Sequence, residues 1–192
     1  MPSETLVTAV PATRDQLVRR TLAVVLGAAL VALSAQVEIP LGFSPVPITL
    51  QGAAIVLVGM TLGPRLGAAA LVSYLTMGVA GLPVFAGASF GILKLLGPTG
   101  GYLLAFPLGA WVAGAVATRD SQLATPVKYL LGAVAGIVVI HLGGWSWLAI
   151  ATHNARAAFA LGVAPFIVID LAKAALAAGV GLGLGDRVRR LL

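Results

Sequence analysis

The sequence contains few charged residues and no cysteine. Only 9% of its 192 residues are charged, whereas soluble domains carry about 25%. So few charges do not cover the surface of a water-soluble protein of this length. The absence of cysteine excludes disulfide bonds and cysteine-based metal sites. The chain is instead 59% hydrophobic with a mean hydropathy of +1.04, which predicts an integral membrane protein.

Acidic residues are the scarcer charge: six Asp and Glu stand against twelve Lys and Arg, for a net charge of +6. The basic residues lie at the ends of apolar runs rather than on one stripe with interleaved aromatic residues, so they do not indicate nucleic-acid binding. The chain also has no linker or low-complexity tract. We therefore expect a single membrane domain over residues 1–192, with a cytoplasmic segment (1–20), a helical bundle (21–185) and a basic cytoplasmic tail (186–192).

Six apolar segments are long enough, or nearly so, for membrane helices of about 20 residues. They cover residues 21–36, 48–62, 66–79, 102–117, 128–150 and 163–184. The second and third are short and need tilt or extension into the flanking turns. The first has the character of a signal peptide, but we interpret it as a retained helix. The predicted fold is an all-α bundle of six transmembrane helices.

Two stretches between these segments do not read as membrane helices. Residues 37–51 contain Pro40, Pro45 and Pro47, which excludes a continuous helix and predicts an ordered extracytoplasmic cap. Residues 81–101 are glycine-rich and apolar. Such backbone at membrane depth is tolerated only where protein buries it or where it lines a cavity.

The basic residues are distributed asymmetrically about the six predicted spans. Placing the N-terminus in the cytoplasm puts nine of the twelve on the cytoplasmic side, two outside and one within a span. The nine are Arg14, Arg19, Arg20, Arg65, Arg119, Lys128, Arg187, Arg189 and Arg190. Because cytoplasmic loops carry an excess of Lys and Arg, we expect both termini in the cytoplasm.

Asp170 and Lys173 are the charged residues inside the last predicted span. Their spacing of i, i+3 puts them on one helix face. A charge at the bilayer centre costs a few kcal/mol on insertion scales, so such residues usually face the bundle interior and serve a function. The pair is either a polar anchor for a substrate or a structural ion pair.

Several other residues are candidates for contact with a ligand. Tyr102 follows two glycines that permit close approach, although it is also typical of an interfacial anchor. Gln51 opens the second segment, where it either caps the helix or points into a cavity. Phe43 and Phe90 either cover an apolar ligand or lie at the membrane interface.

Small residues repeat along the first segment, at Ala23, Gly27, Ala28 and Ala32. This pattern lets helices approach closely. Spacing alone favours an internal packing seam over a docking surface for another membrane protein.

One sequence motif is typical of serine hydrolases and indicates an alternative function. Residues 87–91 match G-x-S-x-G around Ser89, and six spans with such a serine resemble rhomboid intramembrane proteases. A nucleophilic serine needs a base within hydrogen-bond reach, and the last segment has no histidine. The chain also lacks a Walker A motif. We therefore expect no catalytic residue, no metal site and no cofactor.

Four stretches together resemble the BioY family, the biotin-specific substrate-binding components of energy-coupling-factor (ECF) vitamin transporters. They are PVPITLQ at 45–51, GLPVF at 81–85, GPTGGYL at 97–103 and DLAK at 170–173. They occur in the family's order over nearly the whole chain after the first 15 residues.

The resemblance implies a six-helix bundle in a bacterial or archaeal cytoplasmic membrane that captures biotin from outside. It implies partnership with a transmembrane coupling protein and two cytoplasmic ATPase subunits, with a solitary transporter as the alternative. It also implies that Asp170 and Lys173 contact the biotin head group, and that Lys94 and Ser89 are further candidates. For the small residues of the first segment, it implies a docking face for the coupling protein.

Overall fold

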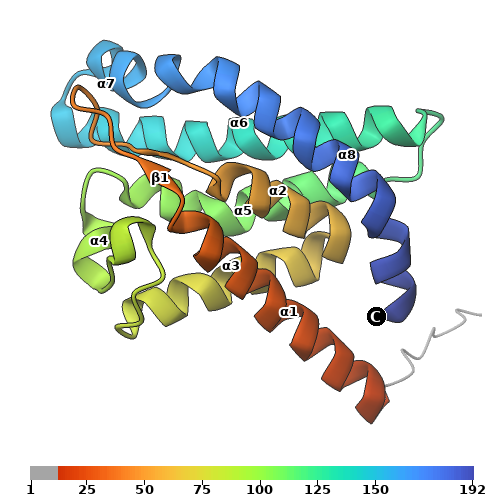
Figure 1. The fold of residues 1–192 in the computed structure, drawn as a ribbon. Coiled ribbons are helices and arrows are strands. Elements are labelled where there is room, and N and C mark those ends of the chain that lie inside the picture. The colour runs from red at the N-terminus through yellow and green to blue at the C-terminus, as the bar shows by residue number, and fades with distance from the viewer. Residues whose placement is uncertain (1–12) are drawn as a thin grey trace, which may run out of the picture.

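A computed structural model describes residues 13–192, which form a helical bundle with one short hairpin (Figure 1). The six long helices are α1 (Arg14–Ala35), α2 (Gln51–Leu62), α3 (Pro64–Val79), α5 (Gly100–Ala117), α6 (Thr125–Thr152) and α8 (Ile167–Leu191). They correspond in order to the six predicted segments, so the predicted fold class is confirmed. Helices α1, α5 and α6 and the stretch Ala155–Leu191 are long and apolar enough to cross a membrane, whereas α2 is apolar but shorter.

The structure adds elements that the sequence reading did not predict. A short helix, α4 (Ile92–Leu96), lies within the glycine-rich stretch, and α7 (Ala155–Gly162) precedes α8. Helix α1 also begins at Arg14 rather than at residue 21, because Thr13 and Gln16 form a capping box. Residues 1–12 of the predicted cytoplasmic segment lie outside the described part of the chain.

The proline-containing cap folds as a small hairpin rather than as loose coil. Strands β1 (Glu38–Ile39) and β2 (Ile48–Thr49) pair antiparallel across it. Beyond α3, a second turn is closed by a bridge between Phe85 and Ser89. The cap and the stretch 81–101 lie at the same end of the bundle, on the left in Figure 1.

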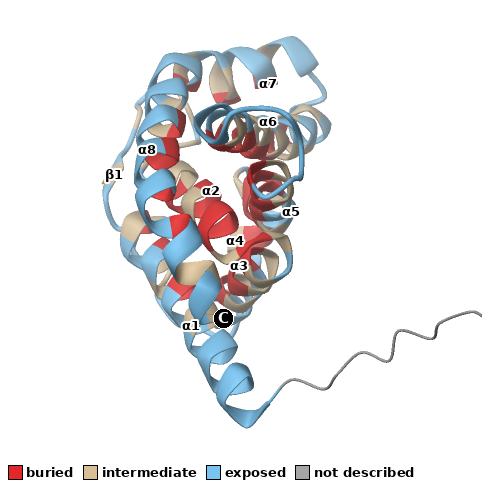
Figure 2. Ribbon diagram, turned by 90° about the vertical axis from the view of Figure 1, so that its right-hand side faces the viewer, coloured by how far each residue is buried: buried red, intermediate tan, exposed pale blue. Residues whose placement is uncertain are grey.

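Helix α2 is at the centre of the bundle, in contact with α1, α3, α5, α6 and α8. Its residues Ile55, Val56 and Met60 are fully buried. Figure 2 shows the buried positions gathered inside the bundle, while the outward faces of α1 and α8 are exposed. Large apolar residues such as Leu26 and Leu33 lie on that exposed surface, as expected for a surface solvated by lipid.

The small residues of α1 pack mainly inward. A Cβ on Gly27 would lie 3.1 Å from both the Ala70 Cβ and a Val58 methyl group. Ala28 is fully buried, and Ala32 packs against the same core, whereas Ala23 is half-buried. The structure therefore favours the internal seam over the docking face for Gly27, Ala28 and Ala32.

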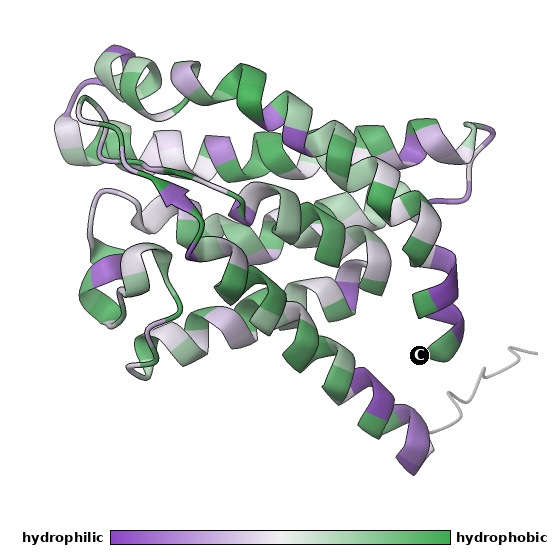
Figure 3. Cartoon of the chain, viewed as in Figure 1, coloured by the Kyte–Doolittle hydropathy of each residue, from purple (hydrophilic) through white to green (hydrophobic). Residues whose placement is uncertain are grey.

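Most of the basic residues lie at the end of the bundle away from the cap, whereas Lys94 of α4 and Arg156 of α7 lie at the capped end. Arg19 and Arg20 of α1 donate hydrogen bonds to the carbonyl groups of Leu191 and Leu192, at 3.4 and 3.0 Å. Figure 3 shows hydrophilic residues at the start of α1, at the end of α8 and in the connection between α5 and α6. The bundle thus has a basic end and a capped end.

Candidate functional site

A cavity opens at the capped end of the bundle. The cap lines it with Val46, Pro47 and Thr49, and the following turn adds Phe85. Helices α5, α6 and α8 form most of the remaining wall, together with the start of α2 and a residue of α4. Most of this lining is apolar, which is typical of a small-molecule site with a few placed polar groups.

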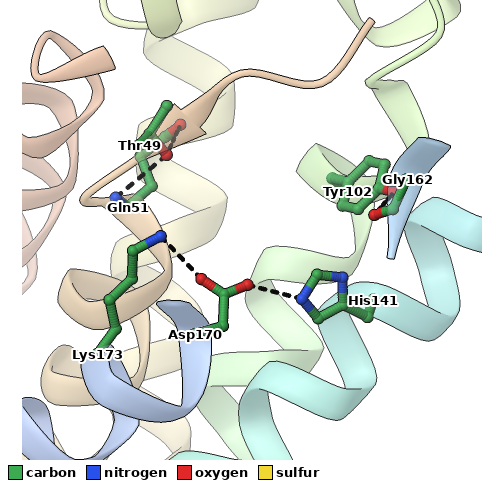
Figure 4. Close-up of polar contacts among 7 residues, drawn as sticks. All are labelled: Thr49, Gln51, Tyr102, His141, Gly162, Asp170 and Lys173. Carbon is green, nitrogen blue, oxygen red and sulfur yellow. Dashed lines mark hydrogen bonds and ion pairs between the residues drawn. The ribbon is translucent and has the colours of Figure 1, made fainter. Parts of the chain in front are cut away.

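Three polar side chains meet in the cavity wall (Figure 4). The Asp170 carboxylate accepts a hydrogen bond from Lys173 Nζ at 2.7 Å, and its other oxygen lies 2.7 Å from His141 Nε2. The side chains of Asp170, Lys173 and His141 are 13%, 11% and 16% exposed. Removing one partner from a buried ion pair costs roughly 3–5 kcal/mol, because the other charge stays buried alone. The three groups therefore form one interdependent unit.

His141 is a candidate functional residue that was not predicted from the sequence. The rule that singled out Asp170, an ionisable residue inside a membrane helix, applies equally to His141. What sequence could not provide is the pairing between α6 and α8 that brings the two residues together.

Gln51 lines the cavity at the first turn of α2 and does not cap that helix, which favours the second of its two predicted positions. It is buried, its side-chain nitrogen donates to the Tyr74 hydroxyl at 2.9 Å, and its oxygen accepts from Thr49 at 3.3 Å. Tyr74 in turn donates to the carbonyl of Val84 at 3.2 Å. This chain of bonds ties the cavity-lining end of α2 to α3 and to the turn that follows it.

Tyr102 is buried in the cavity wall, which does not support the alternative of an interfacial anchor. Its hydroxyl donates to the carbonyl of Gly162 at 2.6 Å. Its ring packs directly on Gly144, where any Cβ would overlap ring atoms. Because the hydroxyl hydrogen is already used, Tyr102 offers a ligand mainly an aromatic surface.

Lys94 of α4 also lines the cavity. It is half-buried and forms no ion pair with any residue between 13 and 192. A flexible ammonium group in this position is suited to a negatively charged part of a ligand.

Three other predicted residues lie outside the cavity lining. Ser89 donates to the carbonyl of Ala86 at 2.6 Å, and within the described residues no histidine is bonded to it. Phe43 and Phe90 are 62% and 59% exposed. The buried aromatic residue of this region is Phe85, which lines the cavity in their place. The geometry therefore does not support ligand contact by these three, or the nucleophile–base pair that a serine hydrolase needs.

In the part of the chain that the structure describes, no group of three or more His, Cys, Asp or Glu side chains is placed to hold a metal ion. The cavity is lined by one carboxylate, two ammonium groups and one imidazole, a set suited to hydrogen bonding with a polar organic molecule. Fold and cavity together define a polytopic membrane protein with a small-molecule pocket at one end.

Comparison with known proteins agrees with this class of membrane protein and identifies a family within it. The model of the BioY family matches residues 4–190. The probable biotin transporter BioY of Pyrococcus horikoshii is 45% identical over 80% of this chain and 88% of its own length. The biotin transporter BioY of Thermotoga maritima is 41% identical over 81% of this chain and 89% of its own.

A solved structure shares the fold. The crystal structure of the S-component for biotin from an ECF-type ABC transporter superposes with a TM-score of 0.79, covers 94% of both chains and is 28% identical. The chain belongs to the BioY family. The resemblance drawn from the four sequence stretches is thereby confirmed.

Proposed function

We propose that this protein captures biotin at the outer face of the cytoplasmic membrane, as the substrate-binding subunit of an ECF-type uptake system. The observation that carries the proposal is the Asp170–Lys173–His141 cluster in an otherwise apolar cavity. Its support from relatives is that several of them are named as biotin transporters.

The chemistry of biotin matches the groups that line the cavity. Its ureido ring has two N–H donors and one carbonyl, which suit the Asp170 carboxylate and the Lys173 ammonium group respectively. The thioether ring and the aliphatic tail are apolar and suit the walls formed by Tyr102 and Phe166. The free carboxylate at the end of the tail suits Lys94.

The cap acts as a lid over the bound molecule. Ser44 of the cap donates to the carbonyl of Leu161 in α7 at 2.7 Å, which fastens the hairpin across the cavity. Biotin entry and exit require this contact to open, because the cap supplies part of the lining.

The chain is not an enzyme in this proposal, and transport is driven by ATP hydrolysis in partner subunits. A transmembrane coupling protein and two ATPase subunits supply that energy at the basic end of the bundle, which faces the cytoplasm together with both termini. Excess Lys and Arg at that end support this orientation. The coupling protein docks on the lipid-facing side of α1, where Ala23 lies beside the exposed Leu22 and Leu26.

Uptake of labelled biotin tests this proposal and its alternative, a solitary transporter. The chain is expressed in cells that lack biotin uptake, alone and together with a coupling protein and ATPases of the ECF class. We expect saturable uptake at nanomolar biotin that requires the ATPases and is lost when their Walker A lysine is replaced. Equal uptake by the chain alone would support the solitary mode, and no uptake in either case would contradict the proposal.

A further inference from the structure

His141 is the one polar member of the cavity cluster that the proposed function leaves without a role. It lies in the middle of α6, 2.7 Å from the carboxylate that is expected to receive the ligand. We propose that His141 is a positioning residue: its neutral imidazole donates the Nε2 hydrogen to Asp170 and fixes the direction in which that carboxylate meets the ligand. This inference rests on the proposed function, since it concerns the same site.

The protonation of the imidazole follows from the surroundings of its two ring nitrogens. An ionised carboxylate only accepts hydrogen bonds, and Lys173 at 2.7 Å favours the ionised form of Asp170, so Nε2 carries a hydrogen. The other nitrogen, Nδ1, is buried and has no hydrogen-bond partner within the described residues. A cationic ring would leave an N–H group there without an acceptor, whereas the neutral ring leaves only a lone pair. The charged groups that line the cavity with His141 are Asp170 and Lys173 from α8 and Lys94 from α4.

Lys173 and His141 donate to different oxygens of the Asp170 carboxylate. Lys173 bonds to Oδ1 and His141 to Oδ2, so that each oxygen is held by one donor (Figure 4). A carboxylate has about four acceptor positions, so each oxygen keeps one for the ligand. Holding the group in place before binding reduces the ordering cost that the ligand must otherwise offset. His141 thus acts on affinity through Asp170 rather than by touching the ligand.

The imidazole is itself held by two aromatic rings. The Tyr102 ring meets it edge to face, with centroids 6.2 Å apart and planes at 86°, and the Phe166 ring lies 6.3 Å away at 37°. These contacts come from α5 and from the turn before α8, so they fix the imidazole from two sides. A positioning group needs this kind of support to transmit a defined geometry.

His141 also separates the cavity from a second, apolar groove on the outside of α6 and α8. Ile137, His141 and Asp170 line both spaces. Truncating His141 to alanine would therefore join the polar site to the lipid-facing groove. A test of the hydrogen bond needs replacements of similar size.

The matched replacements are His141→Phe, which keeps the bulk without the donor, and His141→Gln, which keeps a side-chain N–H. We expect His141→Phe to weaken biotin binding roughly tenfold or more, as for loss of a hydrogen bond to a charged group. His141→Gln should restore affinity to within a few fold of the parent. His153→Asn is the control, because His153 is exposed and its φ of 51° is tolerated by asparagine. Full affinity in folded His141→Phe would overturn the inference.

A double-mutant cycle shows whether His141 acts through Asp170. In an Asp170→Asn background, His141→Phe should change biotin affinity less than about twofold, since contacting residues are not additive. The same loss in both backgrounds would mean that His141 acts independently of the carboxylate, which would contradict a positioning role.

Nitrogen-15 NMR of histidine-labelled protein in lipid nanodiscs tests the inference in the absence of biotin, because it reports the protonation of each ring nitrogen. We expect Nε2 of His141 to carry a hydrogen and Nδ1 to carry none. Replacing Asp170 by Asn should shift the Nε2 signal. The His153→Asn variant assigns the two histidines. A ring protonated at Nδ1 alone would overturn the inference even if biotin binds. Failure of the parent protein to bind biotin would overturn the proposed function, while the NMR result would still decide the His141–Asp170 bond.

Discussion

Lys94 and Lys173 both line the cavity, but they differ in their ion-pair partners. The Lys94 ammonium group lines the cavity without an ion-pair partner among residues 13–192, while Lys173 is committed to Asp170. The two lysines therefore serve different ends of the ligand in the proposed function. In that proposal, Lys94 binds the tail carboxylate, and Lys173 and Asp170 bind the ureido ring.

Replacing Lys94 by Gln should weaken the binding of biotin but not that of biotin amide, whose tail carries no charge. We expect a loss of roughly fivefold to tenfold for biotin, as for a half-buried ion pair. Competition binding with both compounds measures the difference, and Lys128→Gln at the far end of the bundle is the control. An equal loss of affinity for both compounds would show that Lys94 does not bind the tail carboxylate.

At the level of single residues, the sequence indicated an inward-facing position where a strong physical rule applies, while ligand contact stays a prediction. Asp170 and Lys173 were found because charges inside a membrane helix are costly, and the structure brings them into the cavity. Phe43 and Phe90 were chosen for their residue type alone, and they lie exposed on the surface. Whether a loop aromatic points inward depends on the path of the backbone, which no local pattern of these residues specifies.

Among the elements, the cap is the one that lies across the cavity without being part of the helical bundle. Its hairpin is held over the bundle by the Ser44 bond to α7 and lines the cavity with Val46 and Pro47. The bond joins positions 117 residues apart, so it exists only in the folded bundle. Opening of the cap is therefore expected to set the rate at which a bound molecule leaves.

Replacing Ser44 by Ala should speed the release of biotin. A neutral hydrogen bond contributes about 1 kcal/mol, which corresponds to a roughly fivefold faster dissociation if it breaks before release. Dissociation of labelled biotin into excess unlabelled biotin measures this rate. Ser146→Ala, at an exposed position of α6, serves as the matched control. An unchanged rate would mean that the cap does not gate release.

Element boundaries were predicted well where one chemical signal dominates. The prolines in residues 37–51 excluded a continuous helix, and the structure has a hairpin there. Helices α4 and α7 were not predicted, because they are short and lie in stretches that read as loops. The small-residue pattern in α1 indicated close packing correctly, but spacing alone does not identify the packing partner, which is α2 and α3.

The whole molecule is a polarised bundle. One end carries most of the basic residues, and the other carries the cap and the cavity with its polar side chains. The order of six apolar segments was sufficient to predict this architecture, because the hydrocarbon core sets the length of each helix. The cavity itself depends on contacts between helices far apart in the sequence, such as α2 with α8, which composition does not reveal.

Equilibrium titration of the purified protein with biotin tests the central claim most directly. We predict saturable binding of one biotin per chain with a dissociation constant below a micromolar. Asp170→Asn should raise that constant at least tenfold, since the carboxylate loses its charge and part of its acceptor capacity. No saturable binding below micromolar biotin, or the same affinity in Asp170→Asn as in the parent, would contradict the assignment of this cavity to biotin.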